Sequence, residues 1–277
     1  MATVGQALRD AAMALPGEES RAEAELLLAW ALQRSRAWLV AHDRDPLEPE
    51  PRARFSALLA RRRDGEPVAH ILGRRGFWSL DLAVTADTLI PRPETERLVE
   101  LALERLPVGQ VADVLDLGTG TGAIALAIAS ERPEAAVTAV DVDARALAVA
   151  GKNAARLGLG RIQFLRSDWF SAVAGERYRL IVANPPYLAE DDPHLSTGDL
   201  RHEPRLALVS GQDGLDAIRR IVAQAPGHLS PGGWLLLEHG MSQGEAAREL
   251  LRAAGFEQVS TATDIEGRER VSLGRFE

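Results

Sequence analysis

One stretch of the chain is especially informative about architecture: Val111-Ala112-Asp113-Val114-Leu115-Asp116-Leu117-Gly118-Thr119-Gly120-Thr121-Gly122. Its first part, residues 111–117, is apolar enough for a buried strand, and residues 123–130 have the composition of a helix. Three glycines between a strand and a helix allow a tight turn and a close approach of the backbone to a bound molecule. This unit is typical of α/β proteins with a parallel sheet.

The alternation of strand and helix continues beyond this unit. We expect strands at residues 111–117, 137–140, 162–165, 180–183 and 234–237, and helices at residues 123–130 and 144–157. Strands that alternate with helices favour right-handed crossovers and a doubly wound, mostly parallel sheet. Reactive groups in such a sheet lie beyond the carboxyl ends of the strands.

The N-terminal part of the chain has a different pattern. Residues 4–15, 23–33 and 52–63 carry apolar side chains at helical spacing, and residues 76–90 show the alternation expected of a hairpin. The sequence therefore predicts a small helical bundle at residues 1–75, a β-hairpin linker at residues 76–90 and an α/β domain at residues 91–277.

Composition excludes several classes of protein. The chain has 277 residues, a net charge of −8 and no cysteine, which rules out disulfides, thiolate zinc sites and cysteine nucleophiles. The excess of acidic over basic residues argues against a protein that binds duplex nucleic acid nonspecifically. The first ten residues lack a signal-peptide pattern, and no apolar run approaches the length of a membrane span, so we expect a cytoplasmic protein.

The glycine loop alone fits two kinds of cofactor. Gly118-x-Gly120-x-x-Ala123 matches a dinucleotide fingerprint, and Asp141 lies where an acid that binds ribose is found in either class. The segment Asn184–Tyr187 favours S-adenosylmethionine, because a sulfonium cofactor needs a nearby group that places a nucleophile in line with its methyl carbon. We therefore expect cofactor contacts from Gly118, Thr119, Gly120, Thr121, Gly122 and Asp141.

Asn184-Pro185-Pro186-Tyr187 closes the apolar run at residues 180–183. The Asn184 carboxamide oxygen and the Pro185 carbonyl can each accept one N–H bond from a planar amide, and the Tyr187 ring can lie against it. The two prolines fix φ and stiffen these acceptors. We assign Asn184, Pro185 and Tyr187 as catalytic residues and the whole tetrapeptide, including Pro186, as the substrate site, with Asn184 also near the cofactor.

Two further residues follow the third strand of the α/β pattern. Asp168 could accept the adenine amino proton, and the Trp169 indole could cover the adenine ring. A helix cap followed by a core tryptophan is the structural alternative. The six histidines show no ligand spacing, so we expect no metal site.

Together with the residues above, several motifs resemble those of the bacterial release factor glutamine methyltransferases, the HemK/PrmC family, along nearly the whole chain. They are Pro67-Val68-Ala69-His70-Ile71-Leu72-Gly73, Ile90-Pro91-Arg92-Pro93-Glu94-Thr95-Glu96, Asp116 to Gly122, Ser167-Asp168-Trp169-Phe170, Asn184 to Tyr187, and Gly267-Arg268-Glu269-Arg270-Val271. The resemblance implies an N-terminal helical domain that recognises the substrate, followed along the chain by a class I methyltransferase domain.

The resemblance also implies an activity: methyl transfer from S-adenosylmethionine to the side-chain amide of the glutamine in the Gly-Gly-Gln motif of peptide chain release factors, which modulates translation termination. The product is S-adenosylhomocysteine. The release factor is the partner, and no nucleic acid or membrane is expected.

Three other functions fit parts of the pattern. An adenine-amino methyltransferase acting on DNA or RNA could use the same tetrapeptide on a flipped base. A nicotinamide oxidoreductase is compatible with the glycine loop alone. A noncatalytic factor could dock through its helices and merely bind a nucleotide.

Overall fold

The computed structural model describes residues 2–277, and its internal contacts separate them into two compact units. The helical unit comprises the chain up to Arg74 together with Ser196–His202. The sheet unit comprises Arg75–Leu195 and Glu203–Glu277. No sequence pattern predicts that Ser196–His202 groups with residues so distant in the chain.

The helical unit is built from α1 (Val4–Ala14), α2 (Ser20–Leu32), α3 (Arg36–Ala41), α4 (Pro49–Arg63) and α5 (Val68–Leu72). The hydroxyls of Thr3 and Ser35 accept hydrogen bonds from the first turns of α1 and α3. The buried side chains of this unit include Val4, Leu8, Leu27, Leu28, Leu39 and Phe55. The three predicted helices are confirmed, whereas α3 and α5 were missed because they are too short to show a helical period.

The sheet unit contains a seven-stranded sheet in the order β5-β4-β3-β6-β7-β9-β8. Its strands are β3 (Asp113–Leu117), β4 (Ala136–Asp141), β5 (Gln163–Arg166), β6 (Tyr178–Ala183), β7 (Leu229–Glu238), β8 (Glu257–Thr263) and β9 (Glu269–Phe276). The first five pair in parallel, and β9 runs antiparallel to both β7 and β8. The mostly parallel sheet is therefore confirmed.

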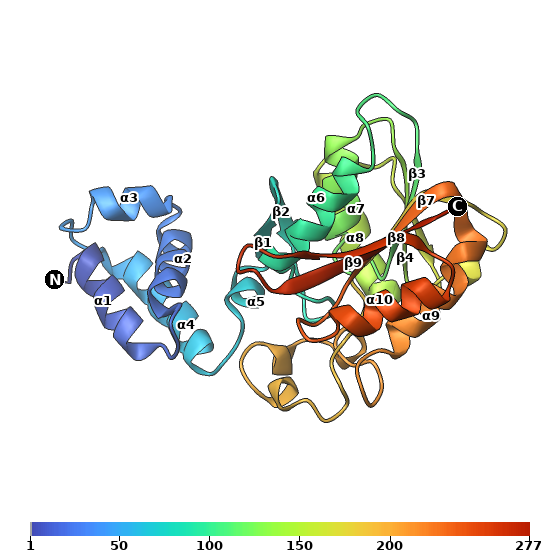
Figure 1. The fold of residues 1–277 in the computed structure, drawn as a ribbon. Helices are drawn as coiled ribbons and strands as arrows, with labels where there is room; N and C mark the ends of the chain where they lie inside the picture. The colour runs from blue at the N-terminus through green and yellow to red at the C-terminus, as the bar shows by residue number, and fades with distance from the viewer. Residues whose placement is uncertain (1) are drawn as a thin grey trace. The chain divides into compact units, whose positions relative to one another are not determined.

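Helices cover both faces of this sheet, as Figure 1 shows. One face packs against α6 (Glu96–Glu104), α7 (Ala123–Glu131) and part of α8 (Ala144–Arg156). The other face packs against α9 (Asp216–Gln224) and α10 (Gly244–Ala253). Alternate residues of β3 point to the two faces: Val114 lies in the first core, and Leu115 and Leu117 in the second.

The hairpin between the α5 and α6 segments is shorter than the predicted one. Strands β1 (Arg74–Phe77) and β2 (Leu80–Ala83) form a two-stranded sheet, and residues 84–90 lie outside it. Phe77 and Leu82 are buried in the core of the sheet unit. Within residues 2–277, no helix is both long enough and apolar enough to cross a membrane.

The strand register aligns the carboxyl ends of four strands, so that four residues at these ends lie in one row. Leu117 of β3 pairs with Val140 of β4 and Ala183 of β6, and Ala183 in turn pairs with Leu237 of β7. The next residues along these strands are Gly118, Asp141, Asn184 and Glu238. They therefore lie side by side at the carboxyl edge of the sheet, around the point where the strand order reverses.

Candidate active site

The glycine loop joins β3 to α7 with an unusual backbone. Gly118, Gly120 and Gly122 have φ values of 72°, 55° and 85°, which other residues rarely adopt. The amides of Gly118 and Thr119 both donate to the Val140 carbonyl at 2.9 Å, which ties the loop to β4. A Cβ added at Gly120 would meet no heavy atom within 4 Å, so protein packing does not account for this glycine.

A cavity of about 460 Å³ opens beside this loop. Its walls include the loop itself, the ends of three strands, and the segments before α6 and α9. The lining residues include Pro91, Arg92, Thr95, Gly118, Thr119, Gly120, Thr121, Asp141, Asp168, Trp169, Asn184, Pro186 and Arg220. The predicted cofactor residues therefore meet at one cavity, except for Gly122, which begins α7 beside it.

Asp141 is held by the backbone around it. Its Oδ2 atom accepts from the Gly120 amide and its Oδ1 atom from the Asp143 amide, each at 2.9 Å. Burial raises the pKa of Asp141, and the backbone hydrogen bonds oppose that rise. Because each carboxylate oxygen can accept a second bond, the geometry is compatible with the predicted contact to ribose hydroxyls.

Trp169 lies against the glycine loop from the β5 side. Its φ of 52° is in the left-handed region, and the Ser167 hydroxyl donates to its carbonyl at 2.7 Å. The Cζ3 atom of its indole would lie 3.8 Å from a Cβ on Gly118. The ring therefore forms an apolar cavity wall of the kind that can cover a purine.

Asp168 has a partner that the sequence analysis did not anticipate. Its side chain is 56% exposed, and its Oδ2 atom pairs with Arg220 of α9 at 2.9 Å. Both residues line the cavity. Asp168 can still accept from an adenine amino group, but it shares its carboxylate with an arginine.

The tetrapeptide after β6 is fixed at both ends. The Asn184 Nδ2 atom donates to the Thr95 hydroxyl at 3.1 Å, and the Gln243 side chain donates to the Tyr187 carbonyl at 3.0 Å. Within the tetrapeptide, Asn184 and Pro186 line the cavity, whereas Pro185 and Tyr187 do not. Burial raises the pKa of Tyr187, and the negative charge of Glu238 adds to the rise.

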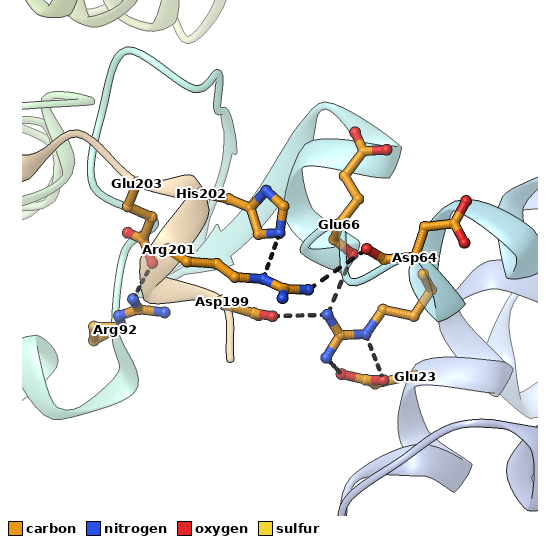
Figure 2. Close-up of polar contacts among 9 residues, drawn as sticks. Glu23, Asp64, Glu66, Arg92, Asp199, Arg201, His202 and Glu203 are labelled. Carbon is orange, nitrogen blue, oxygen red and sulfur yellow. Dashed lines mark hydrogen bonds and ion pairs between the residues drawn. The ribbon is translucent and has the colours of Figure 1, made fainter. Parts of the chain in front are cut away.

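Several residues that shape this site had no predicted role. Thr95 contacts Asn184, and Glu238 follows the β7 residue that pairs with Ala183. Glu203 is buried and accepts from the Ile90 amide at 2.8 Å. It also pairs with Arg92, as Figure 2 shows. The motif at residues 90–96 was a signal for Thr95 and Arg92, but nothing in the sequence indicated Glu203 or Glu238.

Asp116 lies two residues before Gly118 of the glycine loop and carries, within the described chain, an unpartnered oxygen next to the candidate cofactor site. It is fully buried, its Oδ2 atom accepts from the Thr119 hydroxyl at 2.6 Å, and its Oδ1 atom has no hydrogen-bond partner within residues 2–277. Burial raises its pKa to about 7. Asp116 itself does not line the cavity, whereas the Asp141 carboxylate, the glycine loop and the Trp169 indole do, and these three suit a nucleoside such as that of S-adenosylmethionine.

The part of the chain that the structure describes contains no cluster of three or more His, Cys, Asp or Glu side chains arranged to hold a metal ion.

Comparisons with known proteins identify both parts of the chain. Residues 6–73 match the family described as PrmC N-terminal domain, and residues 96–199 match the family described as Methyltransferase small domain. A methyltransferase domain implies S-adenosylmethionine as the methyl donor. A crystal structure of a methyltransferase from Pyrococcus furiosus, 20% identical, has a TM-score of 0.55 and covers 80% of this chain and 98% of that one. This likeness confirms the fold.

Two curated relatives are similar along their whole length. The release factor glutamine methyltransferase of Pseudomonas aeruginosa is 56% identical over 277 residues, which are 100% of this chain and 99% of that protein. The release factor glutamine methyltransferase of Escherichia coli is 51% identical over 270 residues, 97% of each protein. The chain therefore belongs to the family of release factor glutamine methyltransferases.

Proposed function

We propose that this protein transfers a methyl group from S-adenosylmethionine to the side-chain amide nitrogen of the glutamine in the Gly-Gly-Gln motif of peptide chain release factors. One observation carries the proposal beyond family membership. Asn184 and the glycine loop follow paired residues of adjacent strands and line the same cavity. A group that binds an amide thus lies next to a loop suited to the methyl donor.

The tetrapeptide addresses the chemical difficulty of the reaction. An amide nitrogen is a poor nucleophile because its lone pair is delocalised into the carbonyl. The Asn184 carboxamide gives its Nδ2 atom to Thr95, so its oxygen is the atom that accepts a substrate N–H. A second N–H bond to the Pro185 carbonyl would turn the nitrogen lone pair toward the incoming methyl group.

Positioning is the main contribution that we assign to the protein. S-adenosylmethionine supplies, when bound, a methyl group on a sulfonium, and S-adenosylhomocysteine is the product. Holding a nucleophile in a near-attack geometry can supply roughly 7 to 11 kcal/mol of the barrier in favourable cases. The amide becomes acidic as its new bond forms, so its proton can leave late to solvent, and we nominate no general base.

Binding of the release factor requires a surface beyond this cavity, because one glutamine side chain cannot define a protein substrate. We assign that role to the helical unit. The reaction belongs in the cytoplasm, where release factors act in translation termination, and it needs no metal, nucleic acid or membrane.

The test is a transfer assay with methyl-labelled S-adenosylmethionine. We expect label on a purified release factor and none on the same factor with its Gly-Gly-Gln glutamine changed to alanine, or on duplex DNA and RNA controls. Label on a nucleic acid, or none on any substrate, would refute the proposed function.

A further inference from the structure

Glu238 is a buried acid at the edge of the candidate site. It ends β7, is 1% exposed, and follows Leu237, the partner of Ala183 on β6. It therefore lies beside Asn184 in the row of strand ends. Its Oε2 atom has no hydrogen-bond partner within the described chain, residues 2–277. A buried carboxylate in that state stabilises any neighbouring hydroxyl that turns its proton toward it.

The Thr95 hydroxyl also lies next to Asn184, since it accepts from the Asn184 Nδ2 atom at 3.1 Å. Burial raises the pKa of Glu238 to about 7, and hydrogen bonding from the Thr95 hydroxyl is the largest effect that opposes the rise, followed by the positive charge of Arg270. The Tyr187 hydroxyl acts in the same direction, and Glu94 in the opposite one. Glu238 and Thr95 are thus both neighbours of Asn184, the first residue of the tetrapeptide, and Tyr187 is the last residue of that tetrapeptide.

Thr95 has a single proton to give. If that proton goes to Glu238, the Thr95 oxygen can act toward Asn184 only as an acceptor. It then bonds the Asn184 NH₂ group, in agreement with the 3.1 Å contact from Nδ2. A carboxamide turned by half a rotation would set its oxygen against the Thr95 oxygen without a proton between them.

We propose that Thr95 and Glu238 are positioning residues that fix the orientation of the Asn184 carboxamide, so that its oxygen rather than its NH₂ group meets the substrate amide. This inference rests on the proposed function and adds to it the residues that determine which end of Asn184 is presented. Thr95 and Glu238 act through Asn184, and they do not touch the reacting atoms.

The test is a double-mutant cycle on the full-length protein, with a release factor as substrate and labelled S-adenosylmethionine as donor. Thr95→Val keeps the shape of the side chain and removes its hydroxyl. We expect it to lower kcat roughly tenfold to a hundredfold, since a misplaced group in an active site costs about that much. The KM for the release factor and the Kd for S-adenosylmethionine should stay within about twofold, because we assign most of the release-factor binding to the helical unit and the cofactor binding to the glycine loop.

Two further variants separate positioning from general stability. Thr95→Ser keeps a hydroxyl and should recover most of the lost kcat. Thr138→Val removes another buried threonine hydroxyl, on β4 and outside the cavity lining, and should leave kcat near that of the wild type. In an Asn184→Ala background, Thr95→Val should lower the remaining rate by less than about twofold, because the residue through which Thr95 acts is gone.

The outcomes distinguish the two proposals. A wild-type protein that transfers no label to the release factor refutes the proposed function and the inference with it. If the wild type is active, two results overturn the inference alone. One is a Thr95→Val variant with unimpaired kcat. The other is a double variant whose loss in kcat equals the product of the two single losses, because Thr95 and Asn184 would then act independently. A Thr95→Val variant whose Kd for S-adenosylmethionine rises as much as its kcat falls also contradicts it.

Discussion

At the scale of single residues, Asn184 bears the most specific prediction. Asn184→Ala removes the carboxamide oxygen that we assign to the substrate N–H and leaves the glycine loop intact. We expect kcat to fall by about 10² to 10³, as when a preorganised polar group is removed from other active sites, with the Kd for S-adenosylmethionine changed by less than about threefold. Transfer assays and calorimetry measure these two quantities. A parallel loss of both would contradict the assigned role.

Asp116 gives a second prediction at this scale, in the pH dependence of stability. Its pKa in the folded protein is raised to about 7, so between about pH 4 and 7 the folded state holds a proton that the unfolded state has lost. Stability therefore falls as pH rises through this window, and Asp116→Asn abolishes that loss. We expect the free energy of unfolding of Asp116→Asn, relative to the wild type, to be about 2 to 3 kcal/mol higher at pH 8 than at pH 5.

Urea denaturation at both pH values tests this expectation. Asp113→Asn on the same strand is the control, because Asp113 is exposed and no burial cost is relieved there. An Asp116→Asn effect that is equal at pH 5 and pH 8 would count against a raised pKa.

The sequence located residues whose role follows from local chemistry. Asn184 and the glycine loop carry their function in consecutive residues, and the strand pattern alone places them at one edge of the sheet. The roles of Thr95 and Glu238 depend on long-range contacts. Glu238 lies beside Asn184 because of the register of β6 with β7, and Thr95 reaches Asn184 through a hydrogen bond between distant segments. Such a role is not visible in one sequence, because it depends on contacts between distant segments.

At the scale of elements, long periodic segments were predictable and short or edge segments were not. The strands β3 to β7 and the helices α7 and α8 have apolar patterns that burial on the sheet requires. The edge strand β8 and its neighbour β9 were missed, and β8 is partly exposed and mixes polar with apolar residues. The segment before α6 was known only as a motif, and its conformation depends on Glu203.

Glu203→Ala therefore tests how the segment at residues 90–92 is held. The substitution leaves the Ile90 amide and the Arg92 guanidinium without their carboxylate. We expect a loss of about 2 to 3 kcal/mol in the free energy of unfolding, the usual cost of an uncompensated buried partner. Because Pro91 and Arg92 line the cavity, S-adenosylmethionine should also bind more weakly. Urea denaturation and calorimetry measure the two effects, and exposed Glu190→Ala is the control. A variant as stable as that control would refute the prediction.

At the scale of the whole molecule, the chain enters the helical unit twice. The segment Ser196–His202 belongs to that unit, although the residues on both sides of it belong to the sheet unit. Arg62 of α4 contributes to this grouping: it pairs with Glu23 and with Asp199, each at 2.7 Å, and its side chain is only 13% exposed. Figure 2 labels its two acidic partners, Glu23 and Asp199. Sequence patterns cannot reveal such a segment, because it has no periodicity and its contacts, such as those of Asp199 with Arg62 and of Arg201 with the Asp64 carbonyl, are to residues far away in the chain.

Arg62→Ala should release this segment. The substitution leaves the carboxylates of Glu23 and Asp199 without a shared cation, at side-chain exposures of 13% and 33%. Solvent screens part of that cost, so we expect a loss of about 2 kcal/mol rather than the larger values for fully buried pairs. Hydrogen exchange of residues 196–202 should accelerate, while exchange in β3 and β6 stays unchanged.

Arg54→Ala is the matched control on the same helix, because the Arg54–Glu50 pair is largely exposed and should contribute less than about 0.5 kcal/mol. Unchanged exchange at residues 196–202 in the Arg62→Ala protein would show that the segment is held by other contacts.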